Sequence, residues 1–356
     1  MSKARGLADL GNVYDDGALS NRNLIINGAM TIDQRNGGSA VNNANSYTLD
    51  RWYFMQGQAS NTVAHNVEQS STAPADFLNS LKITVATAAN PSTSNYTALF
   101  HRVEGYNSAQ LNYGLSTASA STLSFWVYSS VTGTFGVAIQ NSASTRSYVG
   151  TYTINASNTW EKKTISIQGD TSGTWVKNNG IGLGIHWDIG VGTAQSTTAG
   201  TWQSGNYLGL TGGTKLCQTS GATFYITGVQ LEVGDTATPF EHRSYGDELA
   251  RCQRYTRLLG DGLSGSATSG STFNAAISLQ TPLRATPSLV ITDTSIKISD
   301  NYFSDHTSSG TAVGYATVTS AGGRIGFTGF TGLTTGRFYN AYNNTNEFFL
   351  LLDAEL

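Results

Sequence analysis

The residues best suited to acid–base chemistry are two histidines and three carboxylates on apolar stretches of the chain. They are His101, Glu104, His186, Asp188 and Glu232. A nucleophilic mechanism needs an activated serine with its base, and no Gly-x-Ser-x-Gly element stands beside a matching acid and histidine. Two carboxylates could hydrolyse a glycosidic bond, but their separation is set by the fold. We therefore expect a protein that is not an enzyme, with His186 and Asp188 as a satisfied pair in the core or at its rim.

Metal chemistry is not expected either. Cys217 and Cys252 are the only cysteines, and no His or Cys spacing has the pattern of a zinc site. Two thiols are also too few for a disulfide framework, which is compatible with assembly in a reducing cytoplasm. The sequence predicts no metal and no cofactor.

The triplet Asp50-Arg51-Trp52 permits two interpretations. In the first, Trp52 is a sugar platform, because an aromatic ring stacks on the C–H face of a pyranose while its charged neighbours bind hydroxyls. In the second, Trp52 is buried beside an ion pair that ties two strands together. The triplet opens the apolar run Trp52-Tyr53-Phe54-Met55, so we favour the structural role.

Composition indicates an all-β protein. Charged residues make up 12% of the 356 residues, glycine occurs 40 times, and aromatic residues reach 10%, enough to build a core. The net charge of −3 offers no broad basic field for nucleic acid. No apolar run has the length of a signal peptide or a membrane span, so neither secretion by a signal peptide nor membrane insertion is expected.

Period-two alternation predicts an antiparallel β-sandwich, because every second residue is apolar in stretches such as Leu123–Tyr128. No helical period of ten residues separates the strand-like runs, which argues against a parallel sheet. The runs expected in the first sandwich are 81–85, 123–128, 135–139, 148–154, 163–167, 182–189 and 224–231.

A helix and a second β unit are predicted after the sandwich. Ser244 and Asp247 form a weak capping box at the start of a short helix, and the Gly/Ser-rich stretch 257–272 is typical of a flexible connection. Strand-like runs return at 273–279, 288–292, 296–298, 315–319, 324–329 and 347–352. We therefore predict an attachment segment at 1–22, a jelly roll at 23–243, a helix and linker at 244–272, and a smaller sandwich tip at 273–356.

Two motifs carry a family resemblance. The first is Asn23-Leu24-Ile25-Ile26-Asn27-Gly28-Ala29-Met30, followed by Leu49-Asp50-Arg51-Trp52. The second is Val229-Gln230-Leu231-Glu232-Val233-Gly234, followed by Ala237-Thr238-Pro239-Phe240-Glu241 and by Glu248-Leu249-x-x-Cys252-Gln253-Arg254-Tyr255. Together they resemble the bracketing strands of a bacteriophage tail-fibre or receptor-binding protein whose jelly roll is similar to carbohydrate-binding modules. Leu24 and Leu231 should then belong to one sandwich, and Asp50, Arg51, Trp52, Gln230, Glu232 and Phe240 should be its structural motif.

The resemblance implies a role in the virion. Residues 1–22 would join the protein to the phage tail or to other virion proteins, the fibre would be a homotrimer, and its partner would be a glycan on the host cell surface. The chain would be assembled in the host cytoplasm. Two alternatives stay open: a head fibre or capsid decoration protein, and a polysaccharide depolymerase.

Glycan contacts are expected from aromatic residues on loops and at the tip. The polar loop 195–213 offers little to bury Trp202 and Tyr207, and Trp187 lies before it. In the tip the candidates are Tyr302, Tyr339 and Tyr342, with Phe303 and Phe338 beside them, although some of these must be core. Jelly rolls of the resembled kind often hold a structural Ca²⁺ through an acidic residue on the last strand. Here Gly228 stands at that place, which argues against calcium.

Overall fold

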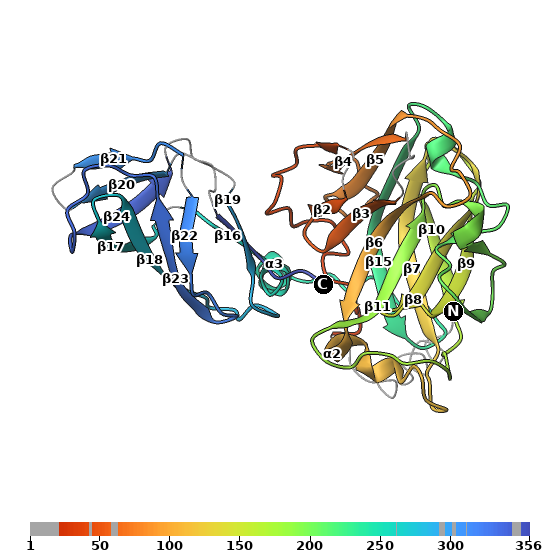
Figure 1. Ribbon diagram of the computed structural model, residues 1–356. Helices are drawn as coiled ribbons and strands as arrows, with labels where there is room; N and C mark the ends of the chain where they lie inside the picture. The colour runs from red at the N-terminus through yellow and green to blue at the C-terminus, as the bar shows by residue number, and fades with distance from the viewer. Residues whose placement is uncertain are drawn as a thin grey trace. The chain divides into compact units, whose positions relative to one another are not determined.

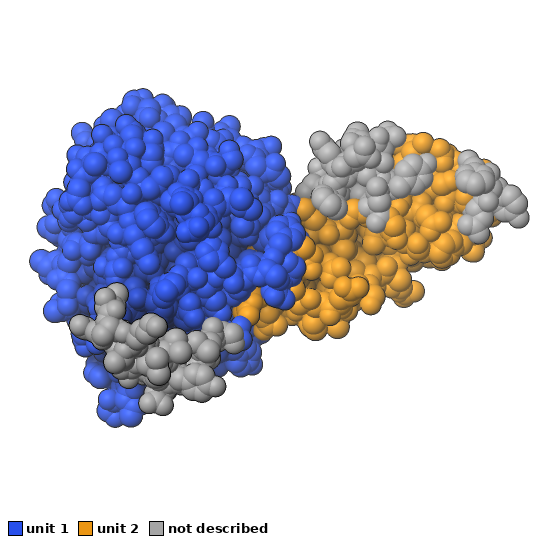
Figure 2. Space-filling view, turned by 180° about the vertical axis from the view of Figure 1, so that it is seen from behind, with its two compact units in different colours: residues 1–248, 356 blue, residues 249–355 orange. Residues whose placement is uncertain are grey.

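A computed structural model describes residues 21–42, 45–57, 63–260, 262–291, 296–300, 304–310, 312–343 and 350–356. The chain divides into two compact units, 1–248 with 356 and 249–355 (Figures 1 and 2). The predicted attachment segment 1–22 lies almost wholly outside the described residues. No helix in the described ranges is long and apolar enough to cross a membrane.

The first unit is a jelly roll of two antiparallel sheets (Figure 1). One is six-stranded, in the order β1 Val41–Asn42, β4 Ala64–Ser70, β5 Ser80–Thr87, β15 Thr223–Val233, β7 Ser121–Ser129 and β10 Glu161–Ile167. The other is seven-stranded, in the order β13 Trp202–Ser204, β9 Arg146–Ile154, β8 Gly133–Asn141, β11 Ile181–Asp188, β6 Tyr96–Glu104, β3 Trp52–Gly57 and β2 Ser46–Leu49. A short parallel pair joins β12 Ser196–Thr197 to β14 Gly209–Leu210.

The core lies between the two sheets, and the alternation in the sequence explains it. Leu123, Phe125 and Val127 of β7 are fully buried in one hydrophobic cluster, whereas Trp126 and Tyr128, each one residue after a buried position, are half-buried on the outer face. All seven strands predicted for the first sandwich are confirmed as β5, β7, β8, β9, β10, β11 and β15. Short helices interrupt the strands at α2 Gly105–Ser108 and, as 3₁₀ turns, at Ala109–Leu111, Thr193–Gln195 and Leu216–Gln218.

The predicted helix after the sandwich is α3, Tyr245–Gln253. Its capping box is confirmed, because the Asp247 N–H donates to the Ser244 hydroxyl (3.2 Å), which in turn donates to the Asp247 carboxylate (2.7 Å). The boundary between the two units falls inside this helix, between Glu248 and Leu249.

The second unit is a smaller sandwich whose two sheets share one core. The larger sheet has the order β21 Asp305–Thr307, β20 Ile296–Asp300, β24 Phe338–Asn343, β17 Ser264–Ser269, β18 Thr272–Ser278, β23 Gly322–Thr328 and β22 Ala312–Ala316. The smaller has the order β16 Thr256–Leu259, β25 Leu350–Asp353 and β19 Ser288–Ile291.

Two local predictions were wrong. The Gly/Ser-rich stretch 257–272 is not a linker, since most of it forms β16 and β17, and β17 pairs with strands on both sides. Small residues are needed there: a Cβ at Gly265 would stand 1.7 Å from the Asn274 carbonyl oxygen. The front motif is also not a strand. Residues 22–35 form turns and irregular backbone that reach β15 through individual hydrogen bonds.

Candidate functional site

The front and middle motifs contact each other and close the first unit. The Leu24 N–H donates to the Leu231 carbonyl (2.8 Å), and the Val229 N–H donates to the Gly28 carbonyl (2.9 Å). We call the contacts between residues 23–28 and 229–248 the clasp. The expectation that Leu24 and Leu231 belong to one sandwich is confirmed.

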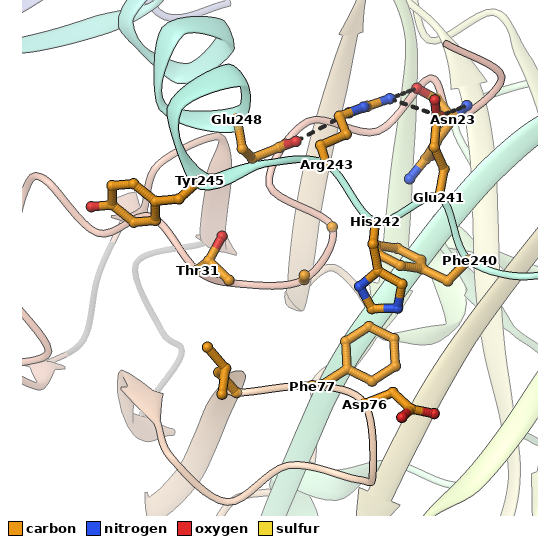
Figure 3. A pocket seen from close by; sticks show the side chains of 13 residues that line it. Asn23, Thr31, Asp76, Phe77, Phe240, Glu241, His242, Arg243, Tyr245 and Glu248 are labelled. Atoms are coloured by element: carbon orange, nitrogen blue, oxygen red, sulfur yellow. Dashed lines mark hydrogen bonds and ion pairs between the residues drawn. The ribbon is translucent and has the colours of Figure 1, made fainter. Parts of the chain in front are cut away.

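Arg243 is the centre of the clasp (Figure 3). Its Nη1 donates to the Ile25 carbonyl (3.0 Å) and Glu248 (3.3 Å), and its Nη2 donates to the Asn23 carbonyl (2.5 Å) and Glu241 (3.2 Å). Charged hydrogen bonds of this kind are stronger than neutral ones. The charged residues of the second motif therefore help to hold the front motif in place.

The triplet Asp50-Arg51-Trp52 is structural. All three residues are at most 1% exposed. Asp50 accepts hydrogen bonds from the backbone N–H (2.6 Å) and side chain (2.8 Å) of Gln34, and the Trp52 indole N–H donates to the Asn27 carbonyl (2.9 Å). The triplet thus fastens the front motif to β3, and the alternative of Trp52 as a sugar platform is wrong.

The other predicted structural residues also belong to this network. The side-chain amide oxygen of Gln230 accepts from the Glu241 N–H (2.8 Å), and Glu232 accepts from the Thr238 N–H (2.9 Å) and hydroxyl (2.6 Å). Phe240 packs edge-on against Phe77 with ring centroids 5.1 Å apart. These contacts explain why the second motif needs an amide, a carboxylate and an aromatic ring at those positions.

A pocket of about 250 Å³ lies beside the clasp (Figure 3). Phe77, Phe240 and His242 line one side of it as a packed aromatic group, with 4.9 Å between the Phe240 and His242 rings. Thr31 and Tyr245 lie across from them. Arg243, Glu241 and Glu248 nearby are paired with one another and with backbone, and the exposed residues Asp76 and Leu78 complete the lining beside the aromatic group.

A second hollow, of about 230 Å³, lies on the outer face of the seven-stranded sheet. We call it the sheet-face hollow. Its floor is built on β6 and β11, where the Phe100 ring stacks on His186 with centroids 3.9 Å apart and an interplanar angle of 19°. The Phe100 ring lies close over Gly184, since a Cβ at that position would be 2.5 Å from it. A glycine is therefore required at position 184.

Tyr96 forms a second ring of the hollow in the same way. It pairs across strands with Gly57, where a Cβ would be 1.9 Å from the tyrosine ring. Tyr96 is half-buried, so part of its ring remains open to solvent. Because Gly57 and Gly184 have no Cβ, the rings of Tyr96 and Phe100 can lie against the sheet instead of projecting from it.

Arg102 brings a positive charge to this face. Its guanidinium lies 4.7 Å from the Phe100 ring centroid and 5.4 Å from that of Tyr53, which are cation–π distances. It donates weakly to the Tyr47 hydroxyl (3.4 Å) and also donates to the Leu356 carbonyl. No Asp or Glu is among the described residues that line the hollow. The site therefore suits a neutral or an acidic ligand.

Amides and hydroxyls form the rim. Gln140 donates to the Asn206 side chain (2.9 Å) and the Tyr207 carbonyl (3.1 Å), which fixes the loop over the hollow, while Ser142 and Asn206 are exposed. Two polar atoms of the lining, His186 Nδ1 and the side-chain amide oxygen Oε1 of Gln195, are buried without a hydrogen-bond partner among the described residues. Burial lowers the pKa of His186 to about 3, helped by Arg102, so its imidazole is neutral near pH 7.

Asp188 holds the loop that supplies this rim. It is fully buried and accepts from the Val191 N–H (2.9 Å), the Leu210 N–H (3.1 Å) and the Lys215 ammonium. Burial raises the pKa of Asp188, although Lys215 and the two N–H groups lower it in part. The predicted pairing of His186 with Asp188 was wrong. His186 lines the hollow, whereas Asp188 binds the loop.

The predicted glycan residues fall into three groups. Trp187 and Tyr339 are fully buried in the cores of the two units, so both predictions are wrong. Tyr302 and Phe303 lie outside the described residues, as does the side chain of Tyr342 on β24, while Phe338 is 47% exposed. Trp202 and Tyr207 are half-buried.

Trp202 belongs to an aromatic cluster. Its ring centroid is 5.5 Å from those of Tyr113, Tyr148 and Trp175, and its indole N–H donates to the Gln168 carbonyl (2.6 Å). Tyr207 does not line the hollow, although its backbone carbonyl accepts a hydrogen bond from Gln140 of the lining (3.1 Å). The loop 195–213 does reach a candidate site, but through Gln195 and Asn206.

Of the acid–base candidates, each is placed differently. His101 faces the core beside Trp52 (4.9 Å between centroids), and its Nε2 contacts the Ile26 carbonyl (3.0 Å). Glu104 is buried at the end of β6, and Glu232 belongs to the clasp network. Among the described residues, no group of three or more His, Cys, Asp or Glu could hold a metal ion.

Gly228 has a structural explanation. Its φ is +60°, and a Cβ would stand 2.6 Å from the Phe77 ring and 3.0 Å from the Trp126 ring. An aspartate at this position would be strained and would collide with both rings.

No known family model matches the chain, and no curated protein matches it. Among solved structures, a putative sugar-binding protein from Bacteroides thetaiotaomicron is 15% identical over 60% of this chain and 100% of its own, with a TM-score of 0.35. The family 11 carbohydrate-binding module of Clostridium thermocellum is 12% identical over 58% and 99%, with a TM-score of 0.28. The enzymatically active domain of tailspike protein 4 of bacteriophage CBA120 is 12% identical over 60% of this chain, with a TM-score of 0.32, and the match spans only 22% of the tailspike chain.

Proposed function

We propose that the first unit binds a glycan chain in the sheet-face hollow, and that the protein is a phage tail-fibre protein that attaches the phage to the host surface. The observation that carries the proposal is the half-buried Tyr96 ring, laid over Gly57 beside the buried stack of Phe100 on His186 and beneath a rim of amides and hydroxyls. Aromatic rings favour the C–H faces of sugars, and amides and hydroxyls bind their hydroxyl groups.

Electrostatics and unsatisfied polar atoms support the same ligand class. The lining offers a guanidinium and neutral polar groups, which fit hydroxyls and, in acidic polysaccharides, carboxylates. The unpartnered atoms of His186 and Gln195 could bond to a ligand or to water. The five predicted acid–base residues are dispersed or engaged in structural contacts, and we therefore propose binding without cleavage.

The virion role rests on the resemblance of the clasp motifs to tail-fibre proteins. We propose that the chain works in the virion as a homotrimer, because weak glycan contacts become useful when several copies engage one surface. Light scattering of the full chain at micromolar concentration tests this point. A monomer would contradict the trimer and leave the glycan site to be tested separately.

Affinity electrophoresis tests the binding proposal. The full chain is run through gels containing xylan, mixed-linked β-glucan, galactan or bacterial O-polysaccharide, and at least one polymer should retard it. Tyr96→Ala combined with Asn206→Ala should reduce this retardation, because the binding free energy should weaken by about 1–2 kcal/mol, which is a five- to thirtyfold loss of affinity. Tyr106→Ala is the matched control, since Tyr106 is 62% exposed on α2, away from the hollow.

The opposite results would be decisive. If none of the polymers retards the wild-type chain, glycan binding is refuted. If the hollow variant is retarded like the wild type, the site is elsewhere. Release of oligosaccharides during incubation with these polymers would contradict the proposal that the protein does not cleave them.

A further inference from the structure

The outer face of the six-stranded sheet carries a continuous group of aromatic rings. Trp160, Tyr128 and Tyr225 contact one another, with centroid separations of 5.5 Å from Trp160 to Tyr128, 5.1 Å from Tyr128 to Tyr225 and 6.3 Å from Trp160 to Tyr225. Trp126 lies two residues before Tyr128 on β7, and so on the same face, about 7 Å further along the strand. We call these four residues the aromatic face. All four are half-buried and open in part to solvent.

The aromatic face extends to the pocket of Figure 3. Atoms of Trp126 and Phe77 both lie within 3.0 Å of the place where a Cβ at Gly228 would stand, so their rings are neighbours. Phe77 continues to Phe240 and His242 along the pocket wall. A run of rings therefore crosses the sheet and ends in a hollow, which is a path for an extended ligand.

The outward positions of this sheet indicate the class of ligand. On β5, β7, β10 and β15 none of the outward side chains is Val, Leu, Ile or Met; apart from the rings they are mainly Ser and Thr. Of the nearby charges, Lys82 is bound to Glu68 (2.7 Å) and lies 6.0 Å from the Tyr225 ring centroid, while Lys162 is exposed on β10 opposite Trp126. Protein interfaces are enriched in aromatic residues but depleted in Ser and Lys, whereas Ser124, Ser166 and Lys162 lie among these rings on the same face. Rings interleaved with hydroxyls, without aliphatic residues or a strong charge, fit a polyhydroxylated chain better.

We propose that the aromatic face is a second glycan-binding surface, on the side of the sandwich opposite the sheet-face hollow. This inference rests on the proposed function and extends it. Because the two sheets enclose the core, the two surfaces face away from each other, and one short oligosaccharide cannot occupy both. A long or branched polysaccharide can engage both surfaces, and the two weak contacts then reinforce each other.

The test compares four forms of the full chain by affinity electrophoresis in the panel polymer that retards the wild type most. They are the wild type, the hollow variant Tyr96→Ala/Asn206→Ala, a face variant Trp160→Ala/Tyr225→Ala, and all four substitutions together. We expect the face variant to lose at least tenfold in affinity. The hollow variant should keep a residual retardation that the combined variant lacks.

Folding and assembly are checked on the same samples. Trp160→Phe/Tyr225→Phe keeps two rings and should recover most of the affinity, and urea unfolding should show that the face variant remains folded. The second surface is refuted if the face variant binds like the wild type while the hollow variant loses all retardation, a result that leaves the proposed function standing. It is also refuted if light scattering shows that the face variant changes the oligomeric state, because the face is then an interface between copies. A wild-type chain that no polymer retards refutes both proposals.

Discussion

Acidification should destabilise the first unit through three buried histidines. Burial lowers the pKa of His65 to about 4 and the pKa values of His101 and His186 to about 3. All three are therefore neutral in the folded protein at pH 5, whereas in the unfolded chain they titrate near 6.5. The unfolded state binds more protons in that window, so stability is complete above pH 6.5 and is lost as the pH falls towards 4.

The magnitude follows from linkage. Two pH units below the unfolded pKa, each histidine that stays neutral lowers the free energy of unfolding by roughly 3 kcal/mol, and the three together lower it by roughly 8 kcal/mol at pH 4.5. The raised pKa of Asp188 acts in the opposite sense, because its protonation is easier in the folded state, and it offsets part of this loss. Since domains are stable by about 5–15 kcal/mol, the unit should approach unfolding near pH 4.5.

Urea unfolding at pH 7.5, 5.5 and 4.5 measures this effect. All six tryptophans precede residue 203, so their fluorescence reports on the first unit. His65→Gln should remove about one third of the pH dependence. A free energy of unfolding that is constant or rises between pH 6.5 and 4.5 would refute the reasoning, as would an unchanged slope in His65→Gln.

Three further substitutions test the hollow and its loop. Gly184→Ala places a Cβ 2.5 Å from the Phe100 ring and should displace that ring, so affinity for the polymer should fall more than stability does; equal losses would contradict a role in ring placement. Asp188→Asn leaves the Lys215 ammonium without its buried partner and should cost about 3–5 kcal/mol, with faster hydrogen exchange across 191–215; unchanged exchange would show that the loop does not depend on this carboxylate. Trp202→Ala should cost about 2–4 kcal/mol of stability while polymer binding is kept, since its ring packs on three other rings; lost binding at normal stability would restore it as a ligand platform.

The sandwich was predictable because the alternation of apolar and polar residues in strands such as β7 indicates which face of the strand is buried. The helix was predictable from its capping residues. Strand β17 was not, since Ser264–Ser269 has the composition of a linker and becomes a strand only because small residues fit between two neighbours. Tertiary contacts decided that segment, and composition alone could not.

The candidate site was harder to predict than the fold. An aromatic residue on a strand can face either way, so Trp187 could not be recognised as core without its register against β6 and β8. The signal for the hollow was the alternation of Tyr96, Phe100 and Arg102 along β6, together with Gly184 on β11. This signal can be recognised only when the pairing of these two distant strands is known. Phe100 lies over Gly184 only after the two strands meet.

The clasp has a mechanical consequence. The backbone enters the sandwich near Asn23 and leaves it near Arg243, and these two points are joined directly by the hydrogen bond from Arg243 Nη2 to the Asn23 carbonyl. Tension applied through both ends of the unit is therefore carried first by these contacts, while the two sheets behind them remain unloaded. The unit would therefore resist pulling first at this small group of contacts, and the outer faces of its two sheets would keep their shape under load.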